Sequence, residues 1–480
     1  MSYLNIIKKQ KLKKLRLVEI LFYILPLSFV AGNLIVSINL LLFLIFSLFL
    51  IKKKNLTYRF SEINWFLIIF FLYLFFSTVI QFNDYDVWIQ KAREAVADQP
   101  LDENLNPSWL KENLTFENHP IFKSLLLLRF VILIFVIDTL FYNKILSLKK
   151  FFLSSLFCTS FVSMDIIFQY IFGFDIFGIS NSGRYNSGPF GNELIAGGYL
   201  LHFSFISFFY IFYKSKNLNN PLILLTVTVH ALAIALAGNR MPLVLFMFGC
   251  FLLILFIKKI RTVIISSLII FFAVFFVIVS NDDEIKTPYQ NFYYQTLHVG
   301  LIKQLTVKQD EKKELKKEEE NEVYKVGPDG KIDSILRTSG HARIYLTAIE
   351  MWKENHIFGF GQKSFRVKCW EILPRIEGLA CANHPHNYYL EILSEGGIIG
   401  FSLIIVFFII LLRECFVFLN KKKYQKNKSL YLLIPIIIIF FLGIWPLKST
   451  GSFFTNWGGS LFWLNIALLQ SHLKKKTIFN

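Results

Sequence analysis

Repeated apolar runs of about twenty residues limit the folds open to this chain more than any other feature of its sequence. A helix needs about 20 apolar residues to cross a bilayer, and runs such as 263–279 contain no charged residue. Hydrophobic residues make up 54% of the 480 positions, compared with about 45–50% in soluble domains on a count that includes Gly. The sequence therefore predicts an all-α integral membrane protein.

The basic residues lie between the apolar runs, which is the distribution expected of cytoplasmic loops and not of a nucleic-acid-binding surface, despite a net charge of +18. The basic start is followed by an apolar run without a small-residue cleavage site, so we expect the first helix to remain as an anchor. Both termini are expected in the cytoplasm. We expect about twelve spans, at residues 17–30, 34–51, 63–81, 124–141, 151–172, 193–213, 221–237, 242–257, 263–279, 388–412, 430–445 and 457–469.

These spans divide the chain into three parts. Residues 1–279 hold the first nine helices with short loops, residues 280–387 form one large periplasmic loop, and residues 388–480 hold the last three helices. Residues 310–322 are an insert rich in both acidic and basic side chains, to which we assign no function.

The most informative polar stretch begins with His384, Pro385, His386 and Asn387, directly before the tenth span. Pro385 fixes its own φ and disfavours a helical residue before it, so the histidines precede the helix. Asn387 is a good capping residue. His386 then lies at the positive end of the helix, where imidazolium is disfavoured and anions are attracted. An uncharged imidazole beside an anion site suits a general base.

The helix that follows carries more polar groups. Asn387, Glu391 and Glu395 are spaced by four residues and share one face. Gly396 and Gly400 form a small-residue pair that allows another helix to approach closely.

Three arginines stand out on the expected outer face: Arg184 and Arg240, in short loops that otherwise contain almost no basic residues, and Arg343 in the large loop. Each could simply contact lipid headgroups. A guanidinium group is always charged, and its planar fork matches phosphate oxygens. We therefore expect these arginines to bind a diphosphate.

Cys369 and Cys381 are the only two of the five cysteines in the outer region. We expect them to form a disulfide, which an oxidising periplasm permits. A zinc site built from the two histidines and a nearby cysteine lacks a fourth ligand, so no metal is assigned.

In their order along the chain, four segments resemble the O-antigen ligase and polymerase superfamily of bacterial inner membranes. They are Asp165–Gln169 with the Arg184 loop to Glu193, Gly238–Arg240, Arg343 with Trp352 and Phe358–Gly361, and His384–Asn387 with Leu390, Glu395, Gly396 and Gly400.

The resemblance implies a GT-C-like helical bundle with a large periplasmic loop, which moves a glycan from undecaprenyl diphosphate to an acceptor hydroxyl. It implies His386 as the general base, with His384 as the competing base, and Arg240 and Arg343 on the diphosphate. Supporting roles are expected for Asn387, Glu391, Glu395 and Glu193. The expected partners are the lipid-linked glycan, a glycan or lipid-core acceptor and membrane lipids, without a cofactor or nucleic acid. Transfer is expected to invert the anomeric centre without a metal.

Several alternatives remain open from the sequence. Ligation to a lipid core, polymerisation of repeat units and protein O-glycosylation all use the same chemistry. A polysaccharide transporter could also have twelve spans, although the sequence shows none of the internal repeats typical of that class. A receptor with an outer sensing loop would explain the loop but not the arginines.

Overall fold

The computed structural model describes residues 15–54, 56–58, 63–81, 87, 90, 94, 120–183, 185–215, 221–293, 340–373, 379–420 and 431–473. This part of the chain is built from helices, with two isolated β-bridges at Phe174–Ser180 and Ser182–Tyr185. Arg184, the charged insert 310–322 and the basic segment 421–428 lie outside the described residues.

The twelve expected spans each correspond to a helical segment. Residues 15–23 are helical, and the helices that follow are α2 (Leu25–Val30), α3 (Asn33–Lys54), α4 (Asn64–Gln81), α7 (Pro120–Leu126), α8 (Leu128–Tyr142), α9 (Leu148–Phe172), α10 (Ala196–Lys214), α11 (Pro221–Leu236), α12 (Arg240–Phe256), α13 (Arg261–Asn281), α20 (Tyr388–Asn420), α22 (Leu433–Gly443) and α23 (Asn456–Leu473). In the described part, seven helical segments are long and apolar enough to cross a membrane, and three shorter apolar helices accompany them. The protein is a multi-pass membrane bundle, as the sequence predicts.

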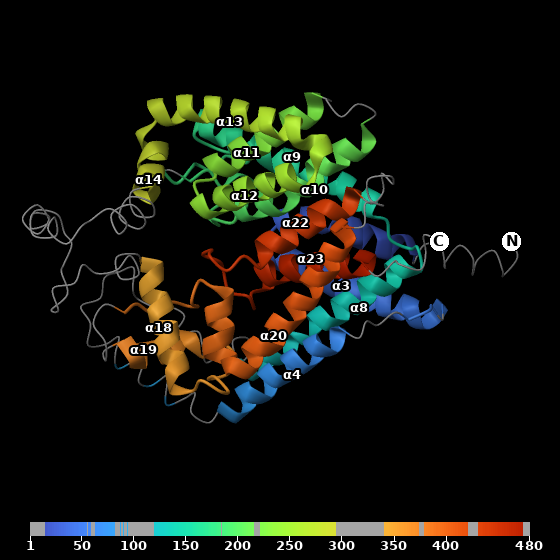
Figure 1. The fold of residues 1–480 in the computed structure, drawn as a ribbon, viewed down its shortest axis with the longest axis vertical. Helices are drawn as coiled ribbons and strands as arrows, with labels where there is room; N and C mark the ends of the chain where they lie inside the picture. The colour runs from blue at the N-terminus through green and yellow to red at the C-terminus, as the bar shows by residue number, and fades with distance from the viewer. Residues whose placement is uncertain are drawn as a thin grey trace, which may run out of the picture.

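The bundle has two groups of helices joined through its centre (Figure 1). In one group α9, α10, α11, α12 and α13 pack together, and in the other α4 packs against α20. Between them lie α22 and α23, and α23 packs closely against α8. One large apolar core, which includes Phe70, Phe203 and Trp463, unites these helices.

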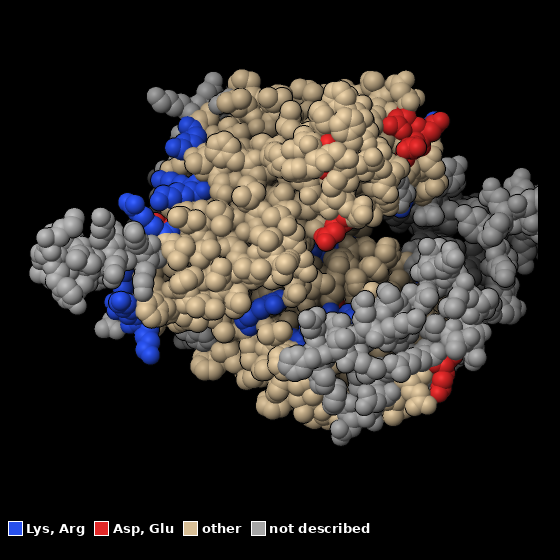
Figure 2. Space-filling view, turned by 180° about the vertical axis from the view of Figure 1, so that it is seen from behind, with Lys and Arg blue, Asp and Glu red and all other residues tan. Residues whose placement is uncertain are grey.

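Charged residues separate along the molecule. The last turn of α3 is basic (Lys52–Lys54), as are the end of α10 and the short turn at Lys258–Ile260, whereas the first turn of α14 (Asp283–Tyr293) is acidic. Figure 2 shows Lys and Arg gathered at one edge, a broad uncharged band, and Asp and Glu gathered toward the other side. The band is the surface expected to contact lipid.

Two helices of the large loop, α18 (Gly340–Glu354) and α19 (Phe365–Ile372), lie together at one side of the bundle (Figure 1). They share a small apolar core of their own, centred on Met351, Phe365 and Trp370. Because this core is separate from that of the bundle, α18 and α19 form a packed unit of their own, which contacts α20.

One feature of α20 differs from the continuous helix that the sequence predicts. Gly397 has φ 61° and ψ −168°, so the helix is interrupted there. Residues 356–361, here called the strap, run alongside the break. The N–H groups of Phe360 and Gly361 donate to the carbonyls of Ser394 and Glu395 at 3.2 and 2.8 Å.

Beyond the break the direction of donation reverses. The N–H of Ile398 donates to the His356 carbonyl at 2.9 Å, and that of Ile399 donates to the Ile357 carbonyl at 3.4 Å. Backbone groups freed by a helix break must find partners within the protein when no water is available. The strap supplies them, which makes the break part of a paired structure.

The small-residue pair of α20 packs as expected. A Cβ atom added at Gly396 would lie 3.0 Å from Leu74, and one added at Gly400 would lie 3.2 Å from Tyr73. The Tyr73 hydroxyl also donates to the Gly396 carbonyl at 2.9 Å. These contacts let α4 approach α20 closely at the break.

Candidate active site

Three imidazole rings form a row where α18 meets the segment before α20. The ring centroids of His341 and His386 are 4.8 Å apart, and those of His386 and His384 are 4.2 Å apart. His384 and His386 were expected at the site. His341, from the first turn of α18, was not, because nothing in the sequence relates it to residues more than forty positions later.

The backbone around His386 is fixed from two sides. Its φ is +54°, a left-handed conformation that costs a non-glycine residue about 1–3 kcal/mol and persists where the surroundings impose it. Its carbonyl accepts the N–H of Thr450 at 2.8 Å and the hydroxyl of Tyr345 at 3.4 Å. The backbone of His386 is therefore held by α18 and by the loop between α22 and α23.

That loop, residues 444–455, is fastened to the start of α20. Asn387 caps the helix through Oδ1, which accepts the N–H groups of Tyr389 and Leu390 at 3.0 and 3.2 Å, as the sequence predicts. Its Nδ2 donates to the Pro446 carbonyl at 2.9 Å. The buried Glu391 carboxylate accepts the N–H of Phe453 at 2.7 Å and also accepts the Ser452 hydroxyl. These two polar residues hold the loop against the histidines.

The surroundings keep the imidazoles uncharged. Burial, and then the charge of His341, lower the pKa of His386 to about 4. Burial, followed by the influence of His386 and Lys363, lowers the pKa of His384 to about 3. A neutral imidazole can accept a proton, which a histidine that was already charged could not do. Both rings are therefore uncharged near neutral pH and able to act as bases.

Arg240 lies near the His341 end of the row, opposite His384. It is the first residue of α12, and its Nη1 donates to the Pro288 carbonyl of α14 at 3.2 Å. Its charge, after burial, lowers the pKa of His341, so the guanidinium group is close enough to act on the imidazole row. The positive end of α12 adds to the attraction that Arg240 exerts on an anion.

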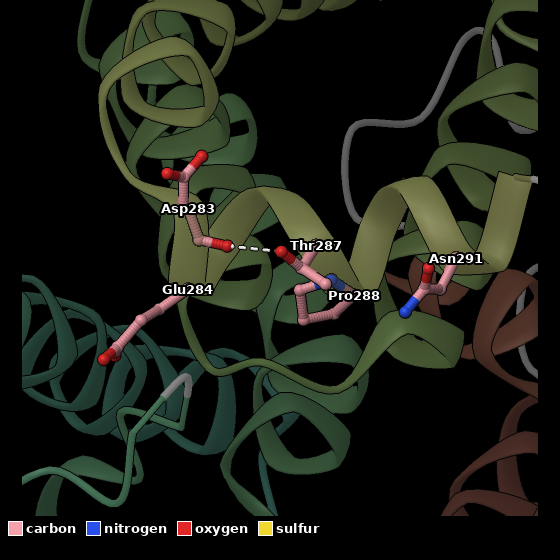
Figure 3. A pocket seen from close by; sticks show the side chains of 5 residues that line it. All are labelled: Asp283, Glu284, Thr287, Pro288 and Asn291. Atoms are coloured by element: carbon pink, nitrogen blue, oxygen red, sulfur yellow. Dashed lines mark hydrogen bonds between the residues drawn. The ribbon is translucent and has the colours of Figure 1, made fainter.

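A groove of about 450 Å³ runs along α14 beside this position. Its lining includes Pro288, whose carbonyl holds Arg240, together with Asp283, Glu284, Thr287 and Asn291 (Figure 3). The carboxylates make this groove unsuitable for a phosphate. We therefore associate anion binding with the guanidinium and not with the groove.

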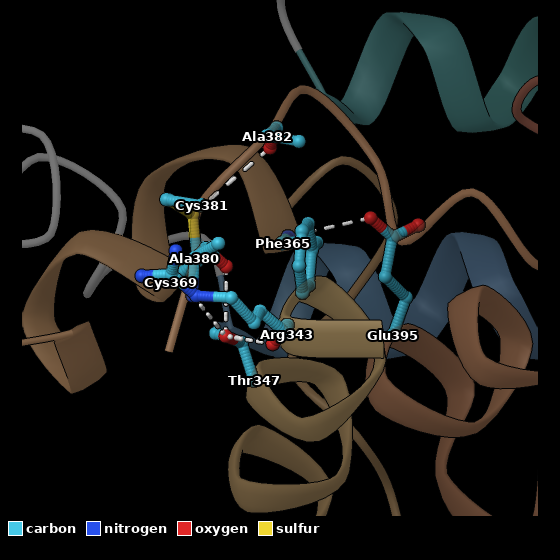
Figure 4. Close-up of a disulfide and its surroundings, with 8 residues drawn as sticks. All are labelled: Arg343, Thr347, Phe365, Cys369, Ala380, Cys381, Ala382 and Glu395. Atoms are coloured by element: carbon cyan, nitrogen blue, oxygen red, sulfur yellow. Dashed lines mark hydrogen bonds between the residues drawn. A yellow bond between two sulfur atoms is a disulfide. The ribbon is translucent and has the colours of Figure 1, made fainter. Parts of the chain in front are cut away.

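Arg343 lies on the opposite face of α18 from His341 and Tyr345. Its Nη2 donates to the Leu379 carbonyl at 3.0 Å, and Thr347, one turn later, donates to the Ala380 carbonyl at 2.7 Å (Figure 4). Residues two positions apart on a helix do not face the same way. The guanidinium is therefore directed toward the segment before the histidines, and its diphosphate-binding role remains a prediction.

The structure joins Cys369 and Cys381 in a disulfide, the pairing that the sequence predicts, with their Cα atoms 5.5 Å apart (Figure 4). The bond ties α19 to the segment that leads into His384. In the described residues, no three His, Cys, Asp or Glu side chains are arranged to hold a metal ion together.

Two further predicted residues are not brought to the row by any described contact. Arg184 is outside the described residues, although its neighbour Asn186 donates to the Leu236 carbonyl at 2.8 Å. That bond places Asn186 beside the end of α11. Its acceptor, Leu236, precedes Arg240 by four residues in the chain. Glu193 is exposed in the turn before α10, and its supporting role remains a prediction.

The structure also reveals two cations that sequence reasoning missed. Lys363 lies between the strap and α19, Arg366 lies in the first turn of α19, and both act electrostatically on His384. The only sequence signal near them is the glycine-rich strap that precedes Lys363. No periodicity or spacing links these cations to the histidines.

Comparison with known families adds one finding. Residues 222–405 match a family model described as O-antigen ligase, which confirms the resemblance to that superfamily. The matched region includes Arg240, α18, the disulfide and the imidazole row. A comparison with curated proteins found no matching sequence.

Proposed function

We propose that this chain, whose residues 222–405 match a family model described as O-antigen ligase, transfers a glycan from undecaprenyl diphosphate to an acceptor hydroxyl. The observation that carries the proposal is the placement of uncharged imidazoles between a guanidinium at the start of α12 and the N-terminus of α20. A base and an anion site on one face of a membrane bundle suit a donor whose leaving group is a lipid-linked diphosphate.

In the proposed reaction an imidazole nitrogen removes the proton of the acceptor hydroxyl as its oxygen attacks the anomeric carbon. The bond from that carbon to the diphosphate oxygen breaks, and its electron pair stays with the diphosphate. Arg240 stabilises the charge that develops there, as a fixed cation at a leaving group does. Attack opposite the leaving group inverts the anomeric centre, and the residues described require no metal for these steps.

Two imidazoles compete for the role of base. His384 Nε2 is buried and has no hydrogen-bond partner among the described residues, so its lone pair is available. His386 lies nearer to His341 and hence to Arg240. Comparing single variants of the two histidines assigns the base.

Ligase and polymerase activity, and transfer to protein, share this chemistry and differ only in the acceptor. We favour the ligase, and propose that the enzyme lies in the bacterial inner membrane with both termini cytoplasmic and its site facing the periplasm. A transporter is the alternative from another class, and a broken helix is typical of that class. Here the strap pairs with the break in α20 through its backbone, which favours a structural role for the break.

The test uses proteoliposomes that contain the purified protein, undecaprenyl-diphosphate glycan and candidate acceptors. We expect His386→Ala and Arg240→Ala to abolish transfer while insertion into the membrane is retained. His356→Ala is the matched control, because this histidine is the first residue of the strap, its side chain is exposed, and alanine leaves its backbone carbonyl in place. The chain length of the product separates ligation from polymerisation. Full transfer by both His386→Ala and His384→Ala would refute the mechanism.

A further inference from the structure

The loop 444–455, between α22 and α23, contacts helices from both groups of the bundle (Figure 1). On one side, the ring centroid of Trp445 lies 4.6 Å from that of Phe248 in α12. On the other side, the loop bonds to the start of α20 and to the segment before it, as described for the active site. The loop therefore connects the helix that begins at Arg240 with the segment that carries the imidazole row.

Lys448 fastens this loop at its centre. Its Nζ donates to the carbonyls of Leu442 and Gly443 at 3.0 and 2.6 Å. Both carbonyls belong to the last turn of α22, where a helix leaves its carbonyl groups without their usual partners and a lysine can supply them. Nζ also lies 5.0 Å from the centroid of the Tyr388 ring, at the start of α20. One side chain thus joins the loop to two helices.

These hydrogen bonds do not depend on the charge of the lysine. Desolvation of the amine lowers the pKa of Lys448 to about 7. The ammonium form has three N–H groups, and the neutral amine still has two, one for each carbonyl. The titratable neighbours of Lys448 are Tyr388 and His202 of α10, on which it acts electrostatically. The contact with α22 is therefore available on both sides of neutral pH.

The two residues after Lys448 contact the imidazole row. The hydroxyl of Ser449 lies 3.4 Å from Nε2 of His341. The N–H of Thr450 donates to the carbonyl of His386 at 2.8 Å. A movement of the backbone at residue 448 would therefore be passed on to two of the three histidines.

Lys448 does not reach the row with its own side chain. Its described side-chain contacts are with the end of α22, with Tyr388 and with His202, and none of these belongs to the row. Any influence on the base must pass through the backbone of residues 448–450. A misplacement of about 1 Å can lower a rate about 10²-fold, so a small displacement of this backbone would be sufficient.

We propose that Lys448 is a positioning residue, which fixes the loop 444–455 and, through it, the placement of His341 and His386 relative to Arg240. Its effect on the transfer rate rests on the proposed function, but its effect on the imidazoles does not. The hydrogen bonds to α22 hold residue 448, its two successors hold the row, and Trp445 holds the side toward α12. The base and the cation are thereby kept at one separation.

The effect on the imidazoles can be measured without transfer, by modification with diethyl pyrocarbonate, which reacts with neutral imidazoles. The full-length protein in lipid nanodiscs is treated at pH 7.5 and at pH 5.5, and modification of His386 is quantified by mass spectrometry. The titratable groups that face His386 are His341, His384 and Tyr345. Because burial lowers the pKa of His386 to about 4, the two rates should be nearly equal in the wild type.

Lys448→Met removes the N–H donors and retains an unbranched side chain. We expect the released loop to admit water to His386, whose pKa should then rise toward its ordinary value of about 6.5, and the ratio of the two rates should rise toward about 10. Lys353→Met, at an exposed lysine of α18, is the matched control and should behave as wild type. The exposed His356 of the strap reports folding, because its modification should be the same in every variant.

A change at His356 would show that Lys448→Met is misfolded, and Lys448→Gln would then decide. Its amide keeps N–H donors on a shorter side chain, so its ratio of rates should lie between those of the wild type and about 10. In the transfer assay, Lys448→Met should lower kcat about 10²-fold with little change in KM for the lipid-linked donor, because Arg240 is retained.

A ratio that stays near that of the wild type in a folded variant would overturn the proposal, even if the variant unfolded more easily, because Lys448 would then support only the end of α22. An unchanged kcat would overturn its bearing on the reaction. A raised ratio in a protein that transfers no glycan to any acceptor would count against the proposed function and leave the positioning of the histidines standing.

Discussion

Replacing Gly397 by alanine tests whether the break in α20 and the strap form one structural unit. A Cβ atom at this position would lie 2.2 Å from the Ile357 carbonyl oxygen and 2.7 Å from the Gly359 nitrogen. Both neighbours are backbone atoms, so a side-chain rotation cannot relieve the overlap. The strap must move or α20 must change its path.

The cost can be worked out from two contributions. A non-glycine residue in this backbone conformation costs about 1–3 kcal/mol. Displacing the strap breaks the four backbone hydrogen bonds between it and α20, and four bonds at about 0.5–1.5 kcal/mol each amount to about 2–6 kcal/mol. We therefore expect Gly397→Ala to lower the free energy of unfolding by at least about 3 kcal/mol.

The assay is equilibrium unfolding in mixed detergent micelles, followed by tryptophan fluorescence. Gly198→Ala is the matched control, because this glycine lies in α10 and an added Cβ would meet no atom within 4 Å. There alanine should leave stability unchanged or raise it by about 0.4–1 kcal/mol. Equal unfolding free energies for Gly397→Ala and the wild type would refute the pairing of strap and break.

Three further predictions concern the site. Arg240→Ala should lower kcat by about 10²–10³-fold, the loss typical of removing one donor that stabilises developing charge, and Arg240→Lys should retain part of the activity because it keeps the charge but loses the planar fork. If His386 is the base, the rate should be flat near neutral pH and fall as the pH drops through about 4. An imidazole in the unfolded chain titrates near about 6.5, so below that pH the unfolded chain binds more protons than the folded chain does. The free energy of unfolding should therefore decrease as the pH falls from about 6.5 to about 4. His386→Ala should make this decrease smaller. Joint replacement of Cys369 and Cys381 by serine should lower the free energy of unfolding by about 3 kcal/mol. Adding reductant to the wild-type protein should lower its free energy of unfolding by the same amount.

Some features were predictable because they depend on neighbouring residues in the chain. Hydropathy predicted an apolar helix at each expected position, since crossing a bilayer requires a continuous apolar run. The cap at Asn387 also follows from local sequence, because a capping side chain bonds to N–H groups two and three residues later. Pro385 before it marks where the helix cannot yet begin.

Other features depend on which segments meet, and the sequence does not encode that directly. His341 joins the row only because α18 packs beside the start of α20. Arg343, two residues after His341, is directed away from the row because residues two positions apart on a helix do not share a face. The residue types predicted phosphate binding equally well for Arg240 and Arg343, but only packing determined which guanidinium lies near the imidazoles.

The sequence by itself determined a membrane bundle, its helices and the two histidines at the entrance to α20, because apolar length, proline geometry and capping are local constraints. Only the tertiary structure decided that α20 is interrupted at Gly397, since two adjacent glycines in an apolar run are compatible with a continuous helix. It also placed Lys363, Arg366, Glu391 and Glu395 in one cluster. The physical reason is that a break or a buried charge is tolerated only where distant segments supply its partners.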